Sequence, residues 1–323
     1  MKSKVFVTRP LPPEALNLLA THCEVQAHPA DSALKPPQLG EACQDVEGLL
    51  AVGVRVNEEV LSQAGKLRVV ANCGVGYDSI DVAACTQRKI VVTNTPGVLT
   101  DTTADLAFAL LLAVARRVVE ADRFVREGRW QRWEFAMMWG ADIHHKTLGI
   151  YGLGRIGQAM ARRGRGFDMQ ILYHSRRRAD EAIERELGAR YVDRETILRE
   201  SDFLTLHTPL TPDTHHLIGA REFSLMKPSA FLINTARGKA VDEEALVAAL
   251  KSRRIAGAGL DVFEHEPHLH PELPKLGNVV LLPHVGSATV ETRLGMAMLA
   301  AENLLAALEG RRPPNVVNPE VYS

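Results

Sequence analysis

The chain has 323 residues, of which 46% are hydrophobic and 24% charged, and its formal net charge is −1. The length favours two domains, and the composition is typical of a folded globular protein. The near-neutral charge argues against nucleic acid or a membrane surface as a partner, and the longest apolar run, residues 106–115, is far shorter than the roughly 20 residues of a membrane span.

The first 99 residues alternate short apolar runs with amphipathic segments. Strands are predicted at residues 5–8, 48–52, 68–72 and 90–93, and helices at 13–20, 37–43, 58–64 and 80–85. Alternation over such short periods is typical of a parallel sheet that is covered by helices on both faces.

Two features of this part indicate a cytoplasmic protein. The four cysteines show no CxxC pairing and suit buried thiols in a reducing compartment. The N-terminal residues pass directly into strand and turn patterns and lack the apolar stretch of a secretory signal.

A long helix is predicted next, from Thr100 or Asp101 as N-cap to Gly128. It is too apolar for a helix with one exposed face, so we expect it to be buried between domains or subunits. The following arm, residues 129–140, contains three tryptophans. This density indicates either internal packing beneath a loop or an interface, which would make the protein a homodimer.

Residues 147–178 show the pattern of a strand, a glycine turn, a helix and a second strand. Gly152, Gly154 and Gly157 follow the apolar run 148–151 at the spacing of a dinucleotide-binding turn. The first glycine permits the tight turn, the second lets the backbone approach a pyrophosphate, and the third lets the helix pack on the sheet. The helix then directs its free N–H groups at the phosphates. The predicted cofactor site also includes the intervening residues Leu153, Arg155 and Ile156.

The end of the second strand bears on the choice of cofactor. NAD-binding units usually place Asp or Glu about 20 residues past the glycine turn. This chain has His174, Ser175, Arg176 and Arg177 there, so no carboxylate repels a 2′-phosphate. Ser175 and Arg176 can bind that phosphate through charge-assisted hydrogen bonds, which predicts NADP(H) as the preferred cofactor. A solvated basic turn that leaves NAD(H) possible is the alternative.

The rest of the chain continues the alternation. Further strands are predicted at 203–207, 230–234, 256–260 and 279–282, and helices at 179–187, 220–226 and 242–250. A final long helix, 289–309, is expected to return to the first 99 residues. The whole is therefore an α/β protein with two doubly wound parallel sheets.

Three loops that follow predicted strands carry polar residues where such a sheet binds its ligands. They supply Arg237, then Asp261 and Glu266, then His284. A guanidinium offers a fork for a carboxylate, and a histidine titrates where it can give or take a proton at neutral pH. A carboxylate beside it would stabilise the imidazolium. Together these residues suit a hydride-transfer site.

Six motifs between residues 72 and 289 carry a resemblance to a known family: NCGVGYDSID, NTPGVLTDTTADLAFALLLAVAR, GIYGLGRIGQAMA, INTARGKAVDEEAL, GAGLDVFEHEP and LPHVGSAT. The chain resembles the D-isomer-specific 2-hydroxyacid dehydrogenases, and most of all their glyoxylate/hydroxypyruvate reductase branch. The resemblance implies a Rossmann cofactor domain, 100–287, inserted into a flavodoxin-like substrate domain that consists of 1–99 and 288–323.

The resemblance also implies roles for single residues. The family's catalytic arginine, glutamate and acid/base histidine fall on Arg237, Glu266 and His284. Val75 and Gly76 match the loop whose N–H groups bind the substrate carboxylate, together with Arg237 and His284. Positions around the nicotinamide and its ribose fall on Thr103, Thr208, Asp261 and Gly286, and the neighbouring Pro209 and Thr235 are included in the expected cofactor site.

The implied activity is NAD(P)H-dependent reduction of small 2-keto acids such as glyoxylate and hydroxypyruvate, with His284 as proton donor. Two alternatives remain: a dinucleotide-sensing corepressor of the same fold, and a related 2-hydroxyacid dehydrogenase with another substrate. A turnover assay separates enzyme from corepressor. His265, His268 and His270 resemble a metal cluster, but they lie in a proline-flanked loop. The reaction needs no metal, so none is expected.

Overall fold

The computed structural model describes residues 2–323, which divide into two compact units. Unit 1 contains the residues up to Leu99 together with Ser287–Ser323, and unit 2 is Thr100–Gly286. The second break falls one residue before the expected position 288. Each unit is described by itself.

Unit 1 has a five-stranded parallel sheet with the strand order β2-β1-β3-β4-β5, which is the order of flavodoxin-like folds. Its strands are β1 (Lys4–Val7), β2 (Glu24–Ala27), β3 (Gly48–Ala51), β4 (Val69–Asn72) and β5 (Val91–Thr93). Its helices are α1 (Pro13–His22), α2 (Pro36–Cys43), α3 (Glu58–Leu61), α4 (Val82–Gln87) and α12 (Val290–Leu308). The last of these packs against α1, β3 and β4, so the end of the chain completes the first sheet's cover.

Unit 2 has a seven-stranded parallel sheet with the order β12-β11-β10-β9-β6-β7-β8, the Rossmann order with one added strand. Its strands are β6 (Thr147–Tyr151), β7 (Gln170–His174), β8 (Ala189–Tyr191), β9 (Phe203–Leu206), β10 (Phe231–Asn234), β11 (Gly257–Leu260) and β12 (Val279–Leu281). Its helices are α5 (Thr100–Ala115), α6 (Val118–Arg126), α7 (Arg155–Arg165), α8 (Glu181–Leu187), α9 (Arg194–Glu200), α10 (Ala220–Leu225) and α11 (Glu243–Lys251). The predicted fold class, two doubly wound parallel sheets, is confirmed.

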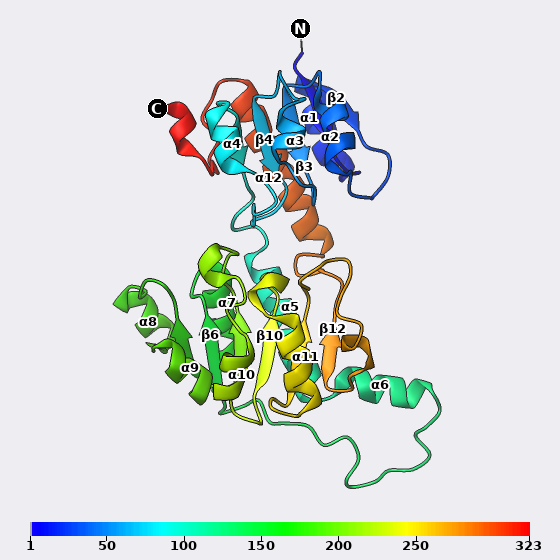
Figure 1. The fold of residues 1–323 in the computed structure, drawn as a ribbon, viewed down its shortest axis with the longest axis vertical. Helices are drawn as coiled ribbons and strands as arrows, with labels where there is room; N and C mark the ends of the chain where they lie inside the picture. Colours follow the sequence, from blue (N-terminus) through cyan, green and yellow to red (C-terminus); the bar gives the residue numbers. More distant parts are fainter. Residues whose placement is uncertain (1) are drawn as a thin grey trace. The chain divides into compact units, whose positions relative to one another are not determined.

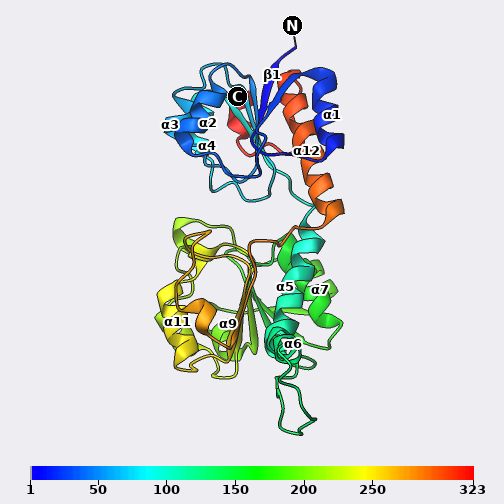
Figure 2. The same cartoon turned by 90° about the vertical axis from the view of Figure 1, so that its right-hand side faces the viewer.

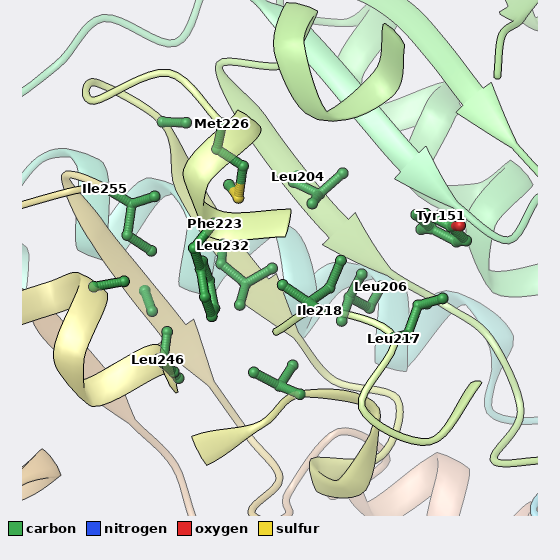
Figure 3. Packing of buried hydrophobic residues seen from close by; sticks show 14 of the residues in the cluster. Tyr151, Leu204, Leu206, Leu217, Ile218, Phe223, Met226, Leu232, Leu246 and Ile255 are labelled. Atoms are coloured by element: carbon green, nitrogen blue, oxygen red, sulfur yellow. The ribbon is translucent and has the colours of Figure 1, made fainter. Parts of the chain in front are cut away.

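Helices cover both faces of each sheet, as Figures 1 and 2 show for the two units separately. In unit 2, α5 and α7 pack on one face, and α9, α10 and α11 on the other, where the largest apolar cluster lies (Figure 3). In unit 1, α1 and α12 lie on one face and α2, α3 and α4 on the other. Burial on both faces explains why the strands have continuous apolar runs.

The prediction of one long helix from residue 100 to 128 is wrong. The chain breaks after Ala115, where Arg117 adopts the left-handed conformation with φ 54°, and a second helix, α6, begins at Val118. The first helix, α5, is buried against α7 and the sheet of its own unit. Burial by the nearest sheet therefore accounts for its apolar content.

Three elements escaped the sequence analysis: β2, β8 and α9. The strands β2 and β8 are three or four residues long, lie at the edges of their sheets and have largely solvated side chains, so they show no apolar run.

In the part of the chain described here, no helix is both long and apolar enough to cross a membrane.

Candidate active site

The glycine turn joins β6 to α7, and its three glycines have separate roles. Gly152 leaves the strand with φ 98°, a conformation that side chains rarely allow. A Cβ at Gly154, the N-cap of α7, would meet no other atom within 4 Å, so the backbone is open to a ligand there. A Cβ at Gly157 would collide with the carbonyl oxygen of Gly152. The helix can approach the turn closely only because this position is glycine.

The N–H groups at the start of α7 are of two kinds, one bonded within the protein and two without a partner in the helix. Leu153 donates its N–H to the hydroxyl of Ser175 at 2.8 Å, which ties the turn to the end of β7. Arg155 and Ile156, in the first turn of α7, have N–H groups that no carbonyl of the same helix can accept. These two amides, with the helix dipole behind them, are available to an anion such as a phosphate.

A nicotinamide dinucleotide fits the residues around this turn. Thr208 and Thr235 follow β9 and β10, and within residues 2–323 their buried hydroxyls have no hydrogen-bond partner. Buried hydroxyls normally have one, so both positions are suited to a bound polar group. Pro209 follows Thr208 directly and is exposed. Thr103 of α5 is buried beside Gly286, so it also belongs to this edge of the sheet.

His284 and Glu266 form a hydrogen-bonded pair. The Nδ1 of His284 lies 2.8 Å from Oε2 of Glu266, and the N–H of Phe263 donates to the other carboxylate oxygen at 2.9 Å. Burial opposes the charge of Glu266, yet its pKa is lowered, because the hydrogen bond and charge of His284, the N–H of Phe263 and the charge of Arg237 outweigh burial. Glu266 is therefore a carboxylate at neutral pH, and it leaves Nε2 of His284 for another partner.

The backbone of His284 is held in an uncommon conformation. Its φ is 56°, in the left-handed region, and its N–H donates to the carbonyl of Asp261 at 2.9 Å. Non-glycine residues in this region often belong to functional sites, since the surrounding structure must compensate the strain. Here the carbonyl of Asp261, which accepts the N–H of His284, helps to hold this conformation.

Asp261 acts on the histidine loop. It is fully buried, and its two carboxylate oxygens accept the N–H groups of Val285 and Gly286, both at 2.8 Å. Burial raises the pKa of Asp261, and these two hydrogen bonds partly offset the effect. Asp261 thus fixes the path of the chain that presents His284, and Gly286 is one of its direct partners.

Arg237 lies close to the same pair. Its loop follows β10 and is tied by the side chain of Asn234, which donates to the carbonyl of Arg237 at 2.9 Å. A Cβ on the next residue, Gly238, would collide with the backbone of Phe263, so the arginine loop packs directly on the loop of Glu266. The structure therefore brings Arg237, Glu266 and His284 together, on loops of the same sheet that carries the glycine turn.

Val75 and Gly76 belong to unit 1, in the loop that follows β4. The sequence analysis missed two residues that shape this loop, Asn72 and Asn94. The side chain of Asn72 donates to the carbonyls of Gly74 and Gly76, both at 2.9 Å, and that of Asn94 donates to the carbonyl of Val75 at 2.8 Å. The carbonyls of Gly74, Val75 and Gly76 therefore all accept hydrogen bonds from asparagine side chains. The available signal was an asparagine at the end of β4 and another directly after β5, where polar residues also singled out the other loops.

The fold and the site together define a class of protein: a dinucleotide-dependent oxidoreductase of two doubly wound α/β units. The profile of the D-isomer specific 2-hydroxyacid dehydrogenase NAD binding domain matches residues 108–286. The chain is 54% identical to the glyoxylate reductase of Thermococcus litoralis over 328 residues, which covers 100% of this chain and 99% of that one.

Solved structures agree. A protein from Thermus thermophilus is 46% identical, with a TM-score of 0.91, over 97% of this chain and 99% of that one. The NADPH-dependent glyoxylate/hydroxypyruvate reductase from Sinorhizobium meliloti, solved with NADP and malonate, is 36% identical, with a TM-score of 0.89, over 99% of this chain and 98% of that one. The chain belongs to the D-isomer specific 2-hydroxyacid dehydrogenase family, within which it is similar to the glyoxylate reductases.

Proposed function

We propose that this protein reduces small 2-keto acids, with glyoxylate and hydroxypyruvate as the first candidates, to 2-hydroxy acids with a reduced nicotinamide dinucleotide. The observation that carries the proposal is the pair of His284 and Glu266 with Arg237 beside it, in a chain 54% identical to a glyoxylate reductase. Unit 2 is the proposed cofactor domain, and unit 1 the proposed substrate domain. The corepressor alternative finds no support among the relatives, which are named as reductases.

The chain's residues divide the work in a simple way. In unit 2, the guanidinium of Arg237 binds the substrate carboxylate. When bound, the cofactor supplies a hydride for the carbonyl carbon. The oxygen then gains a proton from Nε2 of His284, since Nδ1 is held by Glu266. Glu266 stabilises the charged imidazole, and Thr103, Thr208 and Thr235 offer hydroxyls to the cofactor.

The direct test is a steady-state assay of the purified protein. It compares glyoxylate, hydroxypyruvate and other small 2-keto acids, each with NADPH and with NADH. Turnover of at least one keto acid supports the proposal. The absence of turnover for the whole panel, in protein that binds NADPH, would instead favour the sensing role or another 2-hydroxyacid substrate.

The pH dependence follows from the direction of proton flow. Reduction needs protonated His284, so kcat/KM for the keto acid should fall as pH rises, and oxidation of the hydroxy acid should show the opposite limb. Because the lowered pKa of Glu266 keeps it anionic, Glu266→Gln removes a charge that favours the imidazolium. Both limbs should then move to lower pH. Profiles that stay in place or move up would contradict the pairing.

NADPH is the proposed cofactor, on the basis of the turn after β7. Arg176 is exposed, and the described residues give it no ion-pair partner, whereas Arg178 is bound to Glu184 at 2.7 Å. The hydroxyl of Ser175 accepts from Leu153 and can still donate its own hydrogen to a 2′-phosphate. Each charge-assisted hydrogen bond contributes roughly 1.5–3 kcal/mol, or about 10- to 150-fold in affinity.

We expect Ser175→Asp combined with Arg176→Ala to reverse the preference toward NADH, measured as the ratio of kcat/KM for the two cofactors. Arg178→Ala is the matched control, because that arginine is already paired. A wild-type kcat/KM that is higher with NADH would contradict this assignment, while leaving the 2-keto acid chemistry in place.

A homodimer is proposed from the surface of α6 and the arm. Trp133, Phe135 and Trp139 are 64–77% exposed and pack edge-on against one another, which is not internal packing beneath a loop. The helix α6 adds three exposed valines, Val118, Val119 and Val125. A dimer that buries this surface should sediment at twice the 35.5 kDa chain mass at micromolar concentration, and Trp133→Ser with Phe135→Ser should weaken it. A wild-type monomer would remove the proposal.

The cytosol is the proposed place of action. The four cysteines are free, and Cys23, Cys43 and Cys85 are buried, as suits a reducing compartment.

A further inference from the structure

A cluster of metal-binding side chains lies outside the active site just described. Among the residues that the structure describes, His215, His216 and Glu264 are the one group of three whose ligand atoms come within 4.8 Å of one another. The loop histidines His265, His268 and His270, which resemble a metal cluster in the sequence, do not form such a group. We propose that His215, His216 and Glu264 bind a divalent transition-metal ion of the Zn²⁺ type.

The backbone makes this arrangement possible. Neighbouring residues of an extended chain point to opposite sides. At His216 the chain takes φ 48°, and the two imidazoles lie face to face, 4.1 Å apart between centroids and 29° from parallel. The next two residues, Leu217 and Ile218, are buried in the apolar cluster of unit 2 (Figure 3). The N–H of His216 donates to the carbonyl of Lys239 at 2.8 Å, so the pair stands on a fixed base.

The carboxylate of Glu264 is also held in place. Its Oε1 lies 2.8 Å from Nε2 of His216, and its Oε2 accepts the N–H of Glu243 at 3.4 Å. The N–H of Glu264 donates in turn to the side chain of Glu243 at 3.2 Å. Orientation of a ligand by such outer contacts is a general feature of metal sites.

The chemistry and the dimensions fit. Two imidazole nitrogens and one carboxylate oxygen are ligands of Zn²⁺, Ni²⁺ and Cu²⁺, and water can take the remaining position at an exposed site. With bonds of about 2.1 Å, tetrahedral ligand atoms lie roughly 3.4 Å apart. The His216–Glu264 distance of 2.8 Å would have to lengthen by about 0.6 Å. The ligand atom of exposed His215, which lies within 4.8 Å of the other two, would have to approach by at most about 1.4 Å. The ion would then join the segment after β9 to the loop that carries Glu266.

The chain contains a matched control. His144 and His145 are also adjacent and exposed, and His145 also has a positive φ, 60°. Their rings meet edge-on, 5.2 Å apart between centroids and 85° from parallel, and the described residues offer them no carboxylate that completes a group of three.

The test is a titration of the full-length, untagged protein with Zn²⁺ in competition with a chromophoric chelator. We expect one site in the wild type and a loss of affinity of at least about tenfold in His215→Ala and in Glu264→Gln, since even outer partners of a metal act on that scale. The double variant His144→Ala/His145→Ala should bind like the wild type. His215 is exposed, so His215→Ala removes a ligand without opening a cavity in the core. Unchanged Zn²⁺ affinity in His215→Ala, or equal loss in the control variant, would overturn the proposal.

Discussion

Replacing His284 should lower kcat for glyoxylate and hydroxypyruvate by at least about a hundredfold, the usual scale for loss of a general acid. Two variants separate chemistry from backbone strain. His284→Ala removes the imidazole at a position with φ 56°, and His284→Asn also removes the proton donor but places there a residue that tolerates this conformation. Both should lose kcat alike, because neither side chain can protonate the developing oxygen.

The measurement is steady-state kinetics at saturating NADPH, with the thermal midpoint of each variant as a check of folding. His268→Ala serves as control, since His268 is an exposed histidine outside the pair. A kcat within a few-fold of wild type in folded His284→Asn would show that another group donates the proton.

Replacing Arg237 should affect both binding and turnover. A guanidinium can donate two parallel hydrogen bonds to a carboxylate, each charge-assisted and contributing roughly 1.5–3 kcal/mol. We therefore expect Arg237→Ala to raise KM for glyoxylate strongly and to lower kcat as well, for a combined loss in kcat/KM of at least about a hundredfold. Glu266 also loses a nearby positive charge, so its pKa should rise toward the ordinary value.

Two variants define what Arg237 contributes. Arg237→Lys keeps the charge and loses the fork, so it should lie between alanine and wild type. Lys239→Ala removes an exposed cation two residues away and should leave the kinetics unchanged. If Arg237→Ala raised KM with kcat intact, the arginine would bind the substrate equally in ground and transition states, and its proposed part in positioning the reaction would be wrong.

Much of the architecture could be predicted from local patterns. The strands that became β1, β3, β4, β6, β9, β10 and β11 are mostly apolar, because parallel strands inside an α/β sheet are buried on both faces. The glycine turn was recognisable since each glycine answers a local steric demand, at Gly152 a positive φ and at Gly157 a close approach. Polar residues directly after strands marked the loops of Arg237, Asp261 and His284.

Other features depend on contacts between segments far apart in the sequence. The break at Arg117 follows no proline or glycine, so local propensity does not mark it. The task of Asp261 was not readable, because its partners Val285 and Gly286 come 24 and 25 residues later. Ser175 was singled out for a phosphate, yet its hydroxyl also accepts from Leu153, 22 residues before it.

The sequence by itself thus determined the fold class, the dinucleotide turn and the loops that carry His284, Glu266 and Arg237. These depend on side-chain type, on steric rules within a few residues and on strand periodicity, all of which are local. Only the tertiary structure decided how these groups are held: the pairing of His284 with Glu266, the buried support from Asp261, and the carbonyls that Asn72 and Asn94 bind behind Val75. Their hydrogen bonds need distances of about 3 Å, which only the folded sheet of each unit sets between its own loops.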